Sequence, residues 1–349
     1  MQDTQKTSLA DLTSLRVGGD AQNLLLCGDF DQTVRVLLAI DRSEHVNIVS
    51  YGSNILVSDD GLDGTTLMIR GGRIHFEDNV VIADAGVWWD DLVVQAVEHG
   101  LWGLELTSLI PGSVGAGVFG NIAAYGQQVS DTLLWVDVFD RVNNTISRLN
   151  VSELAFSYRE SSLQLCPELV ILRAAFSLST AQKQNLRYQS ALDVGKEYNW
   201  SVDDISDVRK IIAETRKRAG SLYDYRDDSA QRTAGSFFKN PLLNIEKAKE
   251  VASFDESGKA IERLLQQSEL HGGSPARASA AHVLLAAGYR RGQVWERVRL
   301  HPDHVLKIET LEGATAREVH EVSTEIIDTV RKKLDITLEP EVRFMGNFS

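Results

Sequence analysis

Short apolar runs alternate with amphipathic stretches over the first hundred residues. Each run is long enough for one strand. Asp31 is placed to cap a helix whose apolar residues recur at helical spacing. Residues 88–99 carry an apolar helical face that stops at Gly100. The pattern therefore predicts a mixed α and β fold, with strands at 23–27, 45–50, 65–70 and 80–83.

The second part of the chain continues the alternation. Strands are expected at 135–142 and 169–178, around a polar loop at 157–161. Residues 203–218 and 321–334 have apolar residues at helical spacing, and a closing strand is expected at 341–344. The most plausible domain boundary falls between residues 179 and 204.

Two glycine-containing loops follow predicted strands. Residues 110–126 hold five glycines in seventeen positions, too few side chains to build much core. Backbone in such a stretch can approach a bound group closely, and its N–H groups can bind phosphate. The shorter loop at Gly52, Ser53 and Asn54 offers the same donors, but it also suits an ordinary turn. Neither loop is a Walker A loop or a dinucleotide-binding GxGxxG sequence.

Composition narrows the function classes. The formal net charge of −13 disfavours nucleic acid as a partner. Two cysteines exclude a disulfide scaffold and a cysteine-rich metal module. The polar start and the lack of an 18-residue apolar stretch predict a soluble, cytoplasmic protein without a membrane span.

Three later segments place polar residues in apolar surroundings, at 156–161, 234–241 and 338–344. Taken singly, each has an ordinary structural interpretation. Arg159 would be a surface or ion-paired arginine, Ser236 a turn hydroxyl, and Glu341 a carboxylate at a strand end. Their combination and order, together with the glycine loops, are more informative.

The ordered motifs resemble the UDP-N-acetylenolpyruvoylglucosamine reductase (MurB) family over residues 12–346. The shared sequences are TSLRVGGDA at 13–21, GSN at 52–54, the IPGSVGA and NIAAYG run at 110–126, YRES at 158–161, AGSFFKNP at 234–241 and LEPEVRF at 338–344.

The resemblance implies an α+β fold with a FAD-binding region of the vanillyl-alcohol-oxidase type. That region would span residues 1–183, as subdomains of about 1–70 and 71–183, and residues 184–349 would form a substrate-binding α+β domain. The resemblance also implies non-covalent FAD, NADPH as hydride source, and UDP-N-acetylglucosamine enolpyruvate as substrate, in a monomeric oxidoreductase of peptidoglycan precursor synthesis.

Matching the motifs residue by residue implies a set of site positions. Arg159 would grip the substrate carboxylate, Ser236 would donate a proton, and Glu341 would support the enolate intermediate. The FAD positions would be Tyr51, Gly52, Ser53, Asn54, Ile110, Pro111, Gly112, Ser113, Gly115, Ala116, Asn121, Ile122 and Gly126. The substrate positions would be Tyr188, Asn240, Lys217 and His304.

Several positions depart from the family pattern. Ser50 replaces the first glycine of GxGSN, and Ala219 occupies the position of a lysine that binds substrate or NADPH. Lys217 or Arg218 is a candidate replacement for that lysine. Leu285 and His304 are also changed, and His304 stands for a substrate-facing glutamine. The histidines at 282 and 304 lack the spacing of a metal site, so no metal is expected.

Two alternatives to the reductase remain open on the sequence alone. One is a FAD-dependent paralogue acting on a different substrate, because the departures gather in the nucleotide-binding part. The other is a catalytically silent protein that binds FAD or a UDP-sugar. Retention of Arg159, Ser236 and Glu341 favours the reductase over both.

Overall fold

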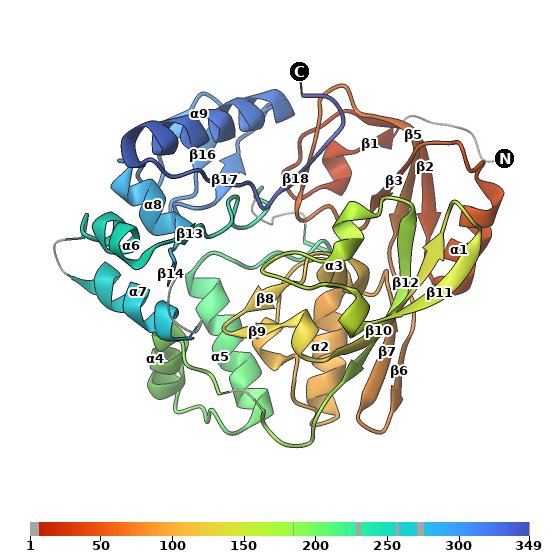
Figure 1. The fold of residues 1–349 in the computed structure, drawn as a ribbon, viewed down its shortest axis with the longest axis horizontal. Coiled ribbons are helices and arrows are strands. Elements are labelled where there is room, and N and C mark those ends of the chain that lie inside the picture. The colour runs from red at the N-terminus through yellow and green to blue at the C-terminus, as the bar shows by residue number, and fades with distance from the viewer. Residues whose placement is uncertain (1–6, 184, 228–231, 256–257, 271–275, 349) are drawn as a thin grey trace. The chain divides into compact units, whose positions relative to one another are not determined.

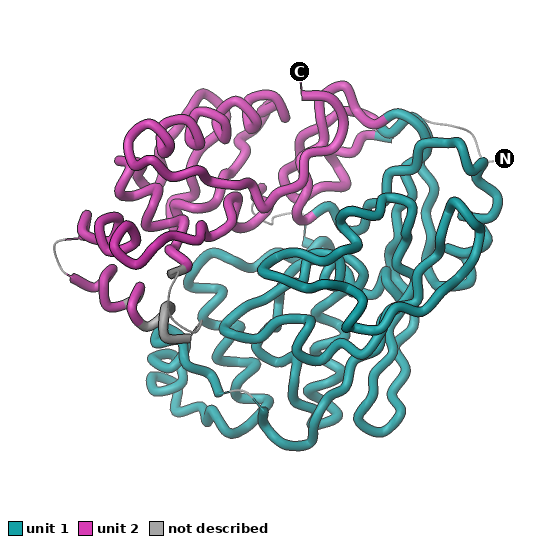
Figure 2. The backbone as a smooth tube through the Cα atoms, in the orientation of Figure 1, with its two compact units in different colours: residues 1–7, 21–52, 63–230 teal, residues 8–20, 53–62, 231–349 magenta. Residues whose placement is uncertain are grey.

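The computed structural model describes residues 7–183, 185–227, 232–255, 258–270 and 276–348. The chain divides into two compact units (Figure 2). Unit 1 comprises residues 1–7, 21–52 and 63–230, and unit 2 comprises residues 8–20, 53–62 and 231–349. The division falls about 50 residues beyond the expected end of the first domain at 183, and two N-terminal segments belong to unit 2.

The helices are α1 (Phe30–Ala39), α2 (Trp89–Glu98), α3 (Val114–Phe119), α4 (Gln189–Tyr198), α5 (Ile205–Arg218), α6 (Ile245–Ala252), α7 (Lys259–Leu270), α8 (Ala280–Ala286) and α9 (Ala316–Leu334) (Figure 1). Short 3-10 turns lie at Ala10–Leu12, Glu105–Thr107, Val129–Asp131, Val151–Glu153 and Ser162–Leu165.

The strands form several sheets. One has the order β1 (Thr7–Ser8), β2 (Asp20–Cys27), β5 (Leu62–Ile69), β3 (Val46–Val49), and a five-stranded antiparallel sheet has the order β11 (Thr145–Asn150), β10 (Leu133–Asp140), β12 (Leu169–Ser177), β7 (Val80–Asp84), β6 (Ile74–Glu77). The smaller sheets pair β4 (Ile55–Val57) with β18 (Arg343–Met345), β8 (Ala123–Ala124) with β9 (Gln127–Gln128), β13 (Leu242–Leu243) with β14 (Ala276–Arg277), and β15 (Val294–Trp295) with β16 (Val298–Leu300) and β17 (Ile308–Thr310).

The main core of unit 1 lies between the five-stranded sheet and helices α2 and α3. Trp89, Leu92, Val93 and Ala96 follow helical spacing along α2, and all four are buried. A second cluster joins α4 and α5 to Trp102 and the Glu105–Thr107 turn. This packing explains why the residues after 183 stay in unit 1.

The sequence located most strands and helices of unit 1 but missed some elements and misplaced one cap. Asp29, and not Asp31, caps α1, and its carboxylate accepts from the Gln32 N–H. Strand β11 and helices α4, α6 and α7 were not predicted, because these segments are rich in polar residues.

Unit 2 has its own core, built on α8, α9 and strands β16 and β17. Helix α9 begins at Ala316, five residues before the expected start, because Thr315 and Glu318 form a capping box there. Asp59, from the N-terminal segment of unit 2, adds a second cap. Its carboxylate accepts from the N–H groups of Ala316 at 2.8 Å and Arg317 at 2.9 Å.

The Asp59→Ala substitution should lower the free energy of unfolding by about 1 kcal/mol, because it leaves two helix N–H groups without a carboxylate at the positive end of α9. Chemical denaturation measures this loss. Asp60→Ala is the matched control, since Asp60 is an equally exposed neighbour. Equal destabilisation by both substitutions would show that the cap contributes nothing of its own.

Candidate functional site

The C-terminal strand of unit 2 brings two of the expected site residues together. Strand β18 pairs in parallel with β4, with Arg343 opposite Ile55. The Asn54 side chain donates to the backbone carbonyl of Glu341 at 3.1 Å, although the two residues are 287 positions apart. The Arg343 N–H donates to the Asn54 carbonyl at 3.1 Å. Asn54 and Glu341 are therefore neighbours, held by backbone pairing.

Ser236 lies beside the same strand. Phe237, the next residue, accepts from the Glu341 N–H at 2.8 Å, and Phe238 forms a bridge with Pro340. Both phenylalanines are buried in the unit 2 core, whereas Ser236 is exposed. The structure thus holds the Ser236 backbone next to Glu341 and leaves the Ser236 hydroxyl accessible.

Asn240 and His304 complete the expected positions in unit 2. The Asn240 side-chain oxygen accepts from the Ala280 N–H at 2.9 Å, so its amide group is oriented by the start of α8. The Nδ1 atom of His304 accepts from the Leu306 N–H at 3.2 Å, which leaves the proton of the neutral ring on Nε2. Burial, followed by the nearby charges of Lys307 and Arg291, lowers the pKa of His304 to about 4. At neutral pH His304 is therefore an uncharged hydrogen-bond donor.

Arg159 lies in unit 1, on a loop braced against the end of α3. It has a left-handed backbone, with φ of 60°. The Gln164 amide donates to the carbonyls of Phe119 at 2.9 Å and Arg159 at 3.1 Å. Asn121 holds the other end of the loop through a bond to the Ser157 carbonyl at 2.9 Å. These bonds fix a strained conformation, which is common at functional sites.

A second arginine, which the sequence analysis did not select, belongs to the same region of unit 1. Burial lowers the pKa of the Arg216 guanidinium, and Tyr125, Asp90 and Arg159 act on it electrostatically. Its Nη2 donates to the Ser221 carbonyl at 2.9 Å, while its enclosed Nε has no hydrogen-bond partner in the described part of the chain. Arg216 follows Val208 and Ile212 at intervals of four residues, so it occupies a position where α5 would ordinarily carry an apolar residue. This arginine on an apolar helix face is the sequence feature that could have identified Arg216.

Tyrosines border these two arginines. The rings of Tyr125 and Tyr188 meet edge to face, with centroids 5.4 Å apart. Burial raises the pKa of both phenols, and Arg159 partly opposes the shift at Tyr188. Tyr188 therefore lies close enough to Arg159 for the two side chains to interact electrostatically.

The structure distinguishes between the two candidate replacements for the missing lysine. Arg218 is engaged by Glu197 at 2.8 Å and by Glu214 at 2.9 Å. Lys217 is exposed and makes no side-chain hydrogen bond to any described residue. Lys217 is therefore the one of the two that is available to a ligand.

The long glycine stretch is not a loop throughout, because residues 114–119 form α3. Gly115 is required for packing rather than for ligand approach, since a Cβ there would lie 2.9 Å from the Ala85 Cβ. The N–H groups of Gly112 and Ser113, in contrast, make no hydrogen bond within the described residues. Gly126, with φ of 91°, has open space where a Cβ would lie. The donors and the open backbone fit an anionic ligand such as the FAD pyrophosphate.

The remaining expected FAD positions have mixed environments. Tyr51 is buried between Trp88 and Tyr225, and its hydroxyl donates to the Gly86 carbonyl at 3.1 Å. Tyr51 could therefore offer backbone rather than side-chain atoms to a cofactor. The Asn121 side chain is also occupied, because it donates to the Ser157 carbonyl and accepts from the Ser130 N–H. Gly52 is in unit 1 and Ser53 is in unit 2, and Ile110, Pro111, Ala116 and Ile122 lie on unit 1 around α3.

Comparison with known proteins places this arrangement in a class. A family model described as "FAD binding domain" matches residues 22–150, and a model described as "UDP-N-acetylenolpyruvoylglucosamine reductase, C-terminal domain" matches residues 227–345. The expected α+β FAD-binding fold with an additional α+β region is confirmed. The FAD-binding model and the reductase relatives described next make the chain a flavoprotein of the oxidoreductase class.

Relatives identify the family. The UDP-N-acetylenolpyruvoylglucosamine reductases of Mycobacterium marinum and Corynebacterium glutamicum are each 32% identical to this chain, over 98% of its length and 95% and 93% of theirs. The crystal structure of the Thermus caldophilus reductase (MurB) has 23% identity and a TM-score of 0.67, with 99% of both chains covered. The chain belongs to the UDP-N-acetylenolpyruvoylglucosamine reductase family.

The described residues offer neither a metal-ligand cluster nor a membrane-spanning helix. No group of three histidine, cysteine, aspartate or glutamate side chains in that part of the chain could hold a metal ion. No helix in the same ranges is long and apolar enough to cross a membrane.

His304 should make the protein less stable in mild acid. Its pKa is about 4 in the folded protein and 6.5 as the ordinary value, so between these values the unfolded chain binds more protons. The stabilisation from a neutral His304 is thus present above pH 6.5 and is lost as the pH falls toward 4. His304→Gln removes this titration, and its melting temperature should fall less than that of the parent between pH 7.5 and 4.5. Parallel declines would remove His304 as a cause.

Proposed function

We propose that this protein reduces UDP-N-acetylglucosamine enolpyruvate to UDP-N-acetylmuramate with NADPH. Family membership over nearly the whole chain supports the reaction. The observation that carries the residue assignments is the pairing of β4 with β18, which places Asn54, Glu341 and the Ser236 backbone together. None of the relatives described above favours a different substrate or a silent binding protein.

FAD is the group that, when bound, supplies hydride transfer between NADPH and the enol ether. The N–H groups of Gly112 and Ser113 would hold its pyrophosphate, and the open backbone at Gly126 would allow its close approach. The other expected positions on these loops, among them Gly52, Ser53 and Asn121, are proposed to line the cofactor through backbone atoms.

Two arginines would supply the positive charge that the reaction needs. Hydride addition at C3 of the enolpyruvyl group leaves negative charge on the carboxylate side as an enolate. Arg159 can grip that carboxylate with its planar guanidinium, and Arg216 provides a second cation beside it. Both side chains are partly buried, so their charge is screened less than that of a fully exposed arginine.

A serine would supply the proton. The Ser236 hydroxyl donates to C2 of the enolate, which is basic enough to accept from an alcohol. Glu341 supports the same intermediate, and we propose that it acts in a protonated or paired form, because a bare carboxylate would repel the enolate. The neutral Nε2–H of His304 replaces a glutamine amide donor, and Tyr188, Asn240 and Lys217 contact the nucleotide part of the substrate.

We infer further that the enzyme works in the cytoplasm, as a monomer, in peptidoglycan precursor synthesis and thereby in cell-wall growth and division. The acidic net charge of −13 supports the absence of a nucleic acid partner. The metabolic role follows from the reaction, because muramic acid is a cell-wall sugar.

Replacing Ser236 should separate the two half-reactions. Ser236→Ala should leave anaerobic reduction of the flavin by NADPH nearly unchanged, because that step needs no proton from Ser236. Reoxidation by UDP-N-acetylglucosamine enolpyruvate should slow by about 100-fold or more, the usual range for loss of a general acid. Stopped-flow absorbance of the flavin measures both rates. If both rates fell equally, Ser236 would be structural.

Gln164→Leu should impair substrate turnover by releasing Arg159. Loss of two hydrogen bonds to carbonyls should cost about 1–2 kcal/mol of stability and should raise the KM for the enolpyruvyl substrate several-fold. Gln32→Leu is the control, because the Gln32 amide also holds a carbonyl of unit 1, that of Leu26. A KM change common to both variants would count against a role for Gln164 in holding Arg159.

A further inference from the structure

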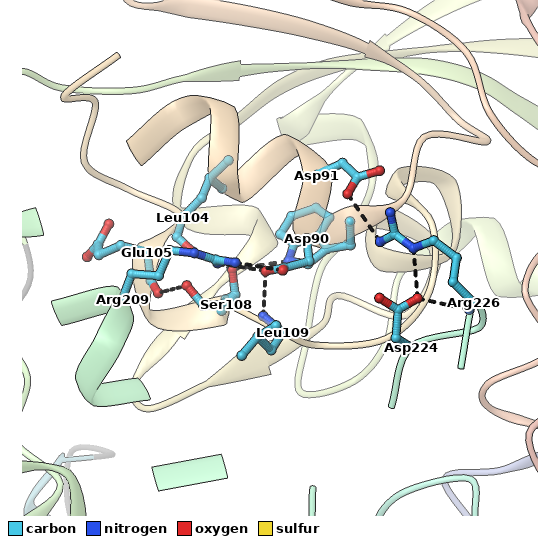
Figure 3. Close-up of polar contacts among 11 residues, drawn as sticks. Asp90, Asp91, Leu104, Glu105, Ser108, Leu109, Arg209, Asp224 and Arg226 are labelled. Atoms are coloured by element: carbon cyan, nitrogen blue, oxygen red, sulfur yellow. Dashed lines mark hydrogen bonds and ion pairs between the residues drawn. The ribbon is translucent and has the colours of Figure 1, made fainter. Parts of the chain in front are cut away.

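A buried ion pair in unit 1 connects three separate segments. Asp90, in the first turn of α2, accepts from both terminal nitrogens of Arg209 on α5, at 2.8 and 2.7 Å (Figure 3). The same carboxylate accepts from the Leu109 N–H at 2.6 Å. The side chains of Asp90 and Arg209 are only 10% and 20% exposed. The pair is therefore bidentate, charge-assisted and poorly accessible to water.

The neighbouring residue offers an internal comparison. Asp91 lies on the same turn and contacts Arg226 at 3.4 Å, but these two side chains are 47% and 51% exposed. Arg226 is also held by Asp224 at 2.8 Å (Figure 3). A surface pair of this kind contributes little. Two adjacent aspartates thus make ion pairs of very different character.

The backbone near Leu109 explains what the buried pair could do. Leu109 has a left-handed backbone, with φ of 60°, which a leucine rarely adopts. It comes three residues before Gly112. The N–H of Trp89, the residue before Asp90, donates to the Gly112 carbonyl at 2.9 Å. Consecutive residues at the start of α2 therefore hold both ends of the 109–112 turn, one by a side chain and one by the backbone.

We propose that Asp90 is a positioning residue for the cofactor, which it does not touch itself. By engaging the Leu109 N–H, it fixes the turn that presents the Gly112 and Ser113 N–H groups to the FAD pyrophosphate. Arg209 orients the Asp90 carboxylate through its two hydrogen bonds. The proposal rests on the assignment of this loop to FAD in the proposed function.

Two double variants isolate the bond to Leu109. Asp90→Asn with Arg209→Leu removes the ion pair but keeps an oxygen that can accept from the Leu109 N–H. Asp90→Leu with Arg209→Leu has nearly the same shape and lacks that oxygen. The Kd of the apoprotein for FAD, measured by quenching of flavin fluorescence, should stay within about threefold of the parent in the first variant. It should rise at least tenfold in the second.

The melting temperatures of the two double variants, measured without FAD, serve as the stability control. If the ion pair had only a structural role, the two variants would have similar melting temperatures and equal Kd values for FAD. Asp91→Leu is the matched single control and should bind FAD as the parent does. Equal Kd values for the two double variants would overturn the proposal.

Two further measurements keep the test decisive. If the leucine double variant does not fold, hydrogen exchange of the parent apoprotein replaces it, and the Leu109 N–H should be protected without FAD. Exchange at the rate of a free amide would overturn the proposal. Gly112→Ala tests the loop assignment itself. If Gly112→Ala binds FAD more weakly while the two double variants bind it equally, the assignment of the loop to FAD stands and only the role of Asp90 is overturned.

Discussion

The parallel pairing of β18 with β4 is the contact on which the site in unit 2 depends. It joins the end of the chain to a segment near residue 55, and it carries Glu341 to Asn54. The Ser58 N–H extends the pairing by donating to the Met345 carbonyl at 2.9 Å. Gly346 ends the strand with φ of 87°, and a Cβ there would overlap Ser58 and Gly61. Segment 53–62 belongs to unit 2 for this reason, whereas segment 8–20 joins that unit because Leu15 and Val17 pack in its core.

The fold was predictable from sequence wherever apolar spacing was long and regular. Helix α2 and strands β10 and β12 lie within a few residues of their expected positions. The ends were less predictable, because they are set by single side chains such as Asp29 and Thr315. The division into units could not be read from composition, since α4 and α5 join unit 1 through contacts with Trp102 and Leu106, about a hundred residues earlier.

The candidate site, too, could be predicted from sequence only in part. Motifs selected Arg159, Ser236 and Glu341 as candidates, because each lies in a short segment of unusual composition. They did not locate Arg216 or Gln164, whose importance comes from neighbours distant in sequence: Arg159 for Arg216, and Phe119 for Gln164. The glycine stretch shows the limit of a motif most clearly. Its glycines have different uses, since Gly115 allows α3 to pack on Ala85, while Gly126 faces open space.

A strongly acidic protein can still bind an anionic ligand if its cations are placed selectively. The net charge of −13 repels anions at long range, but screening limits that effect to about 10 Å. In unit 1, Asp90 binds Arg209 through two hydrogen bonds, whereas it acts on Arg216 electrostatically, and the enclosed Nε of Arg216 has no hydrogen-bond partner among the described residues. Burial of a guanidinium is costly unless an anion offsets it. We therefore propose that an anionic substrate binds beside Arg216, where the pairing along α5 is incomplete, and the overall charge gives no such indication.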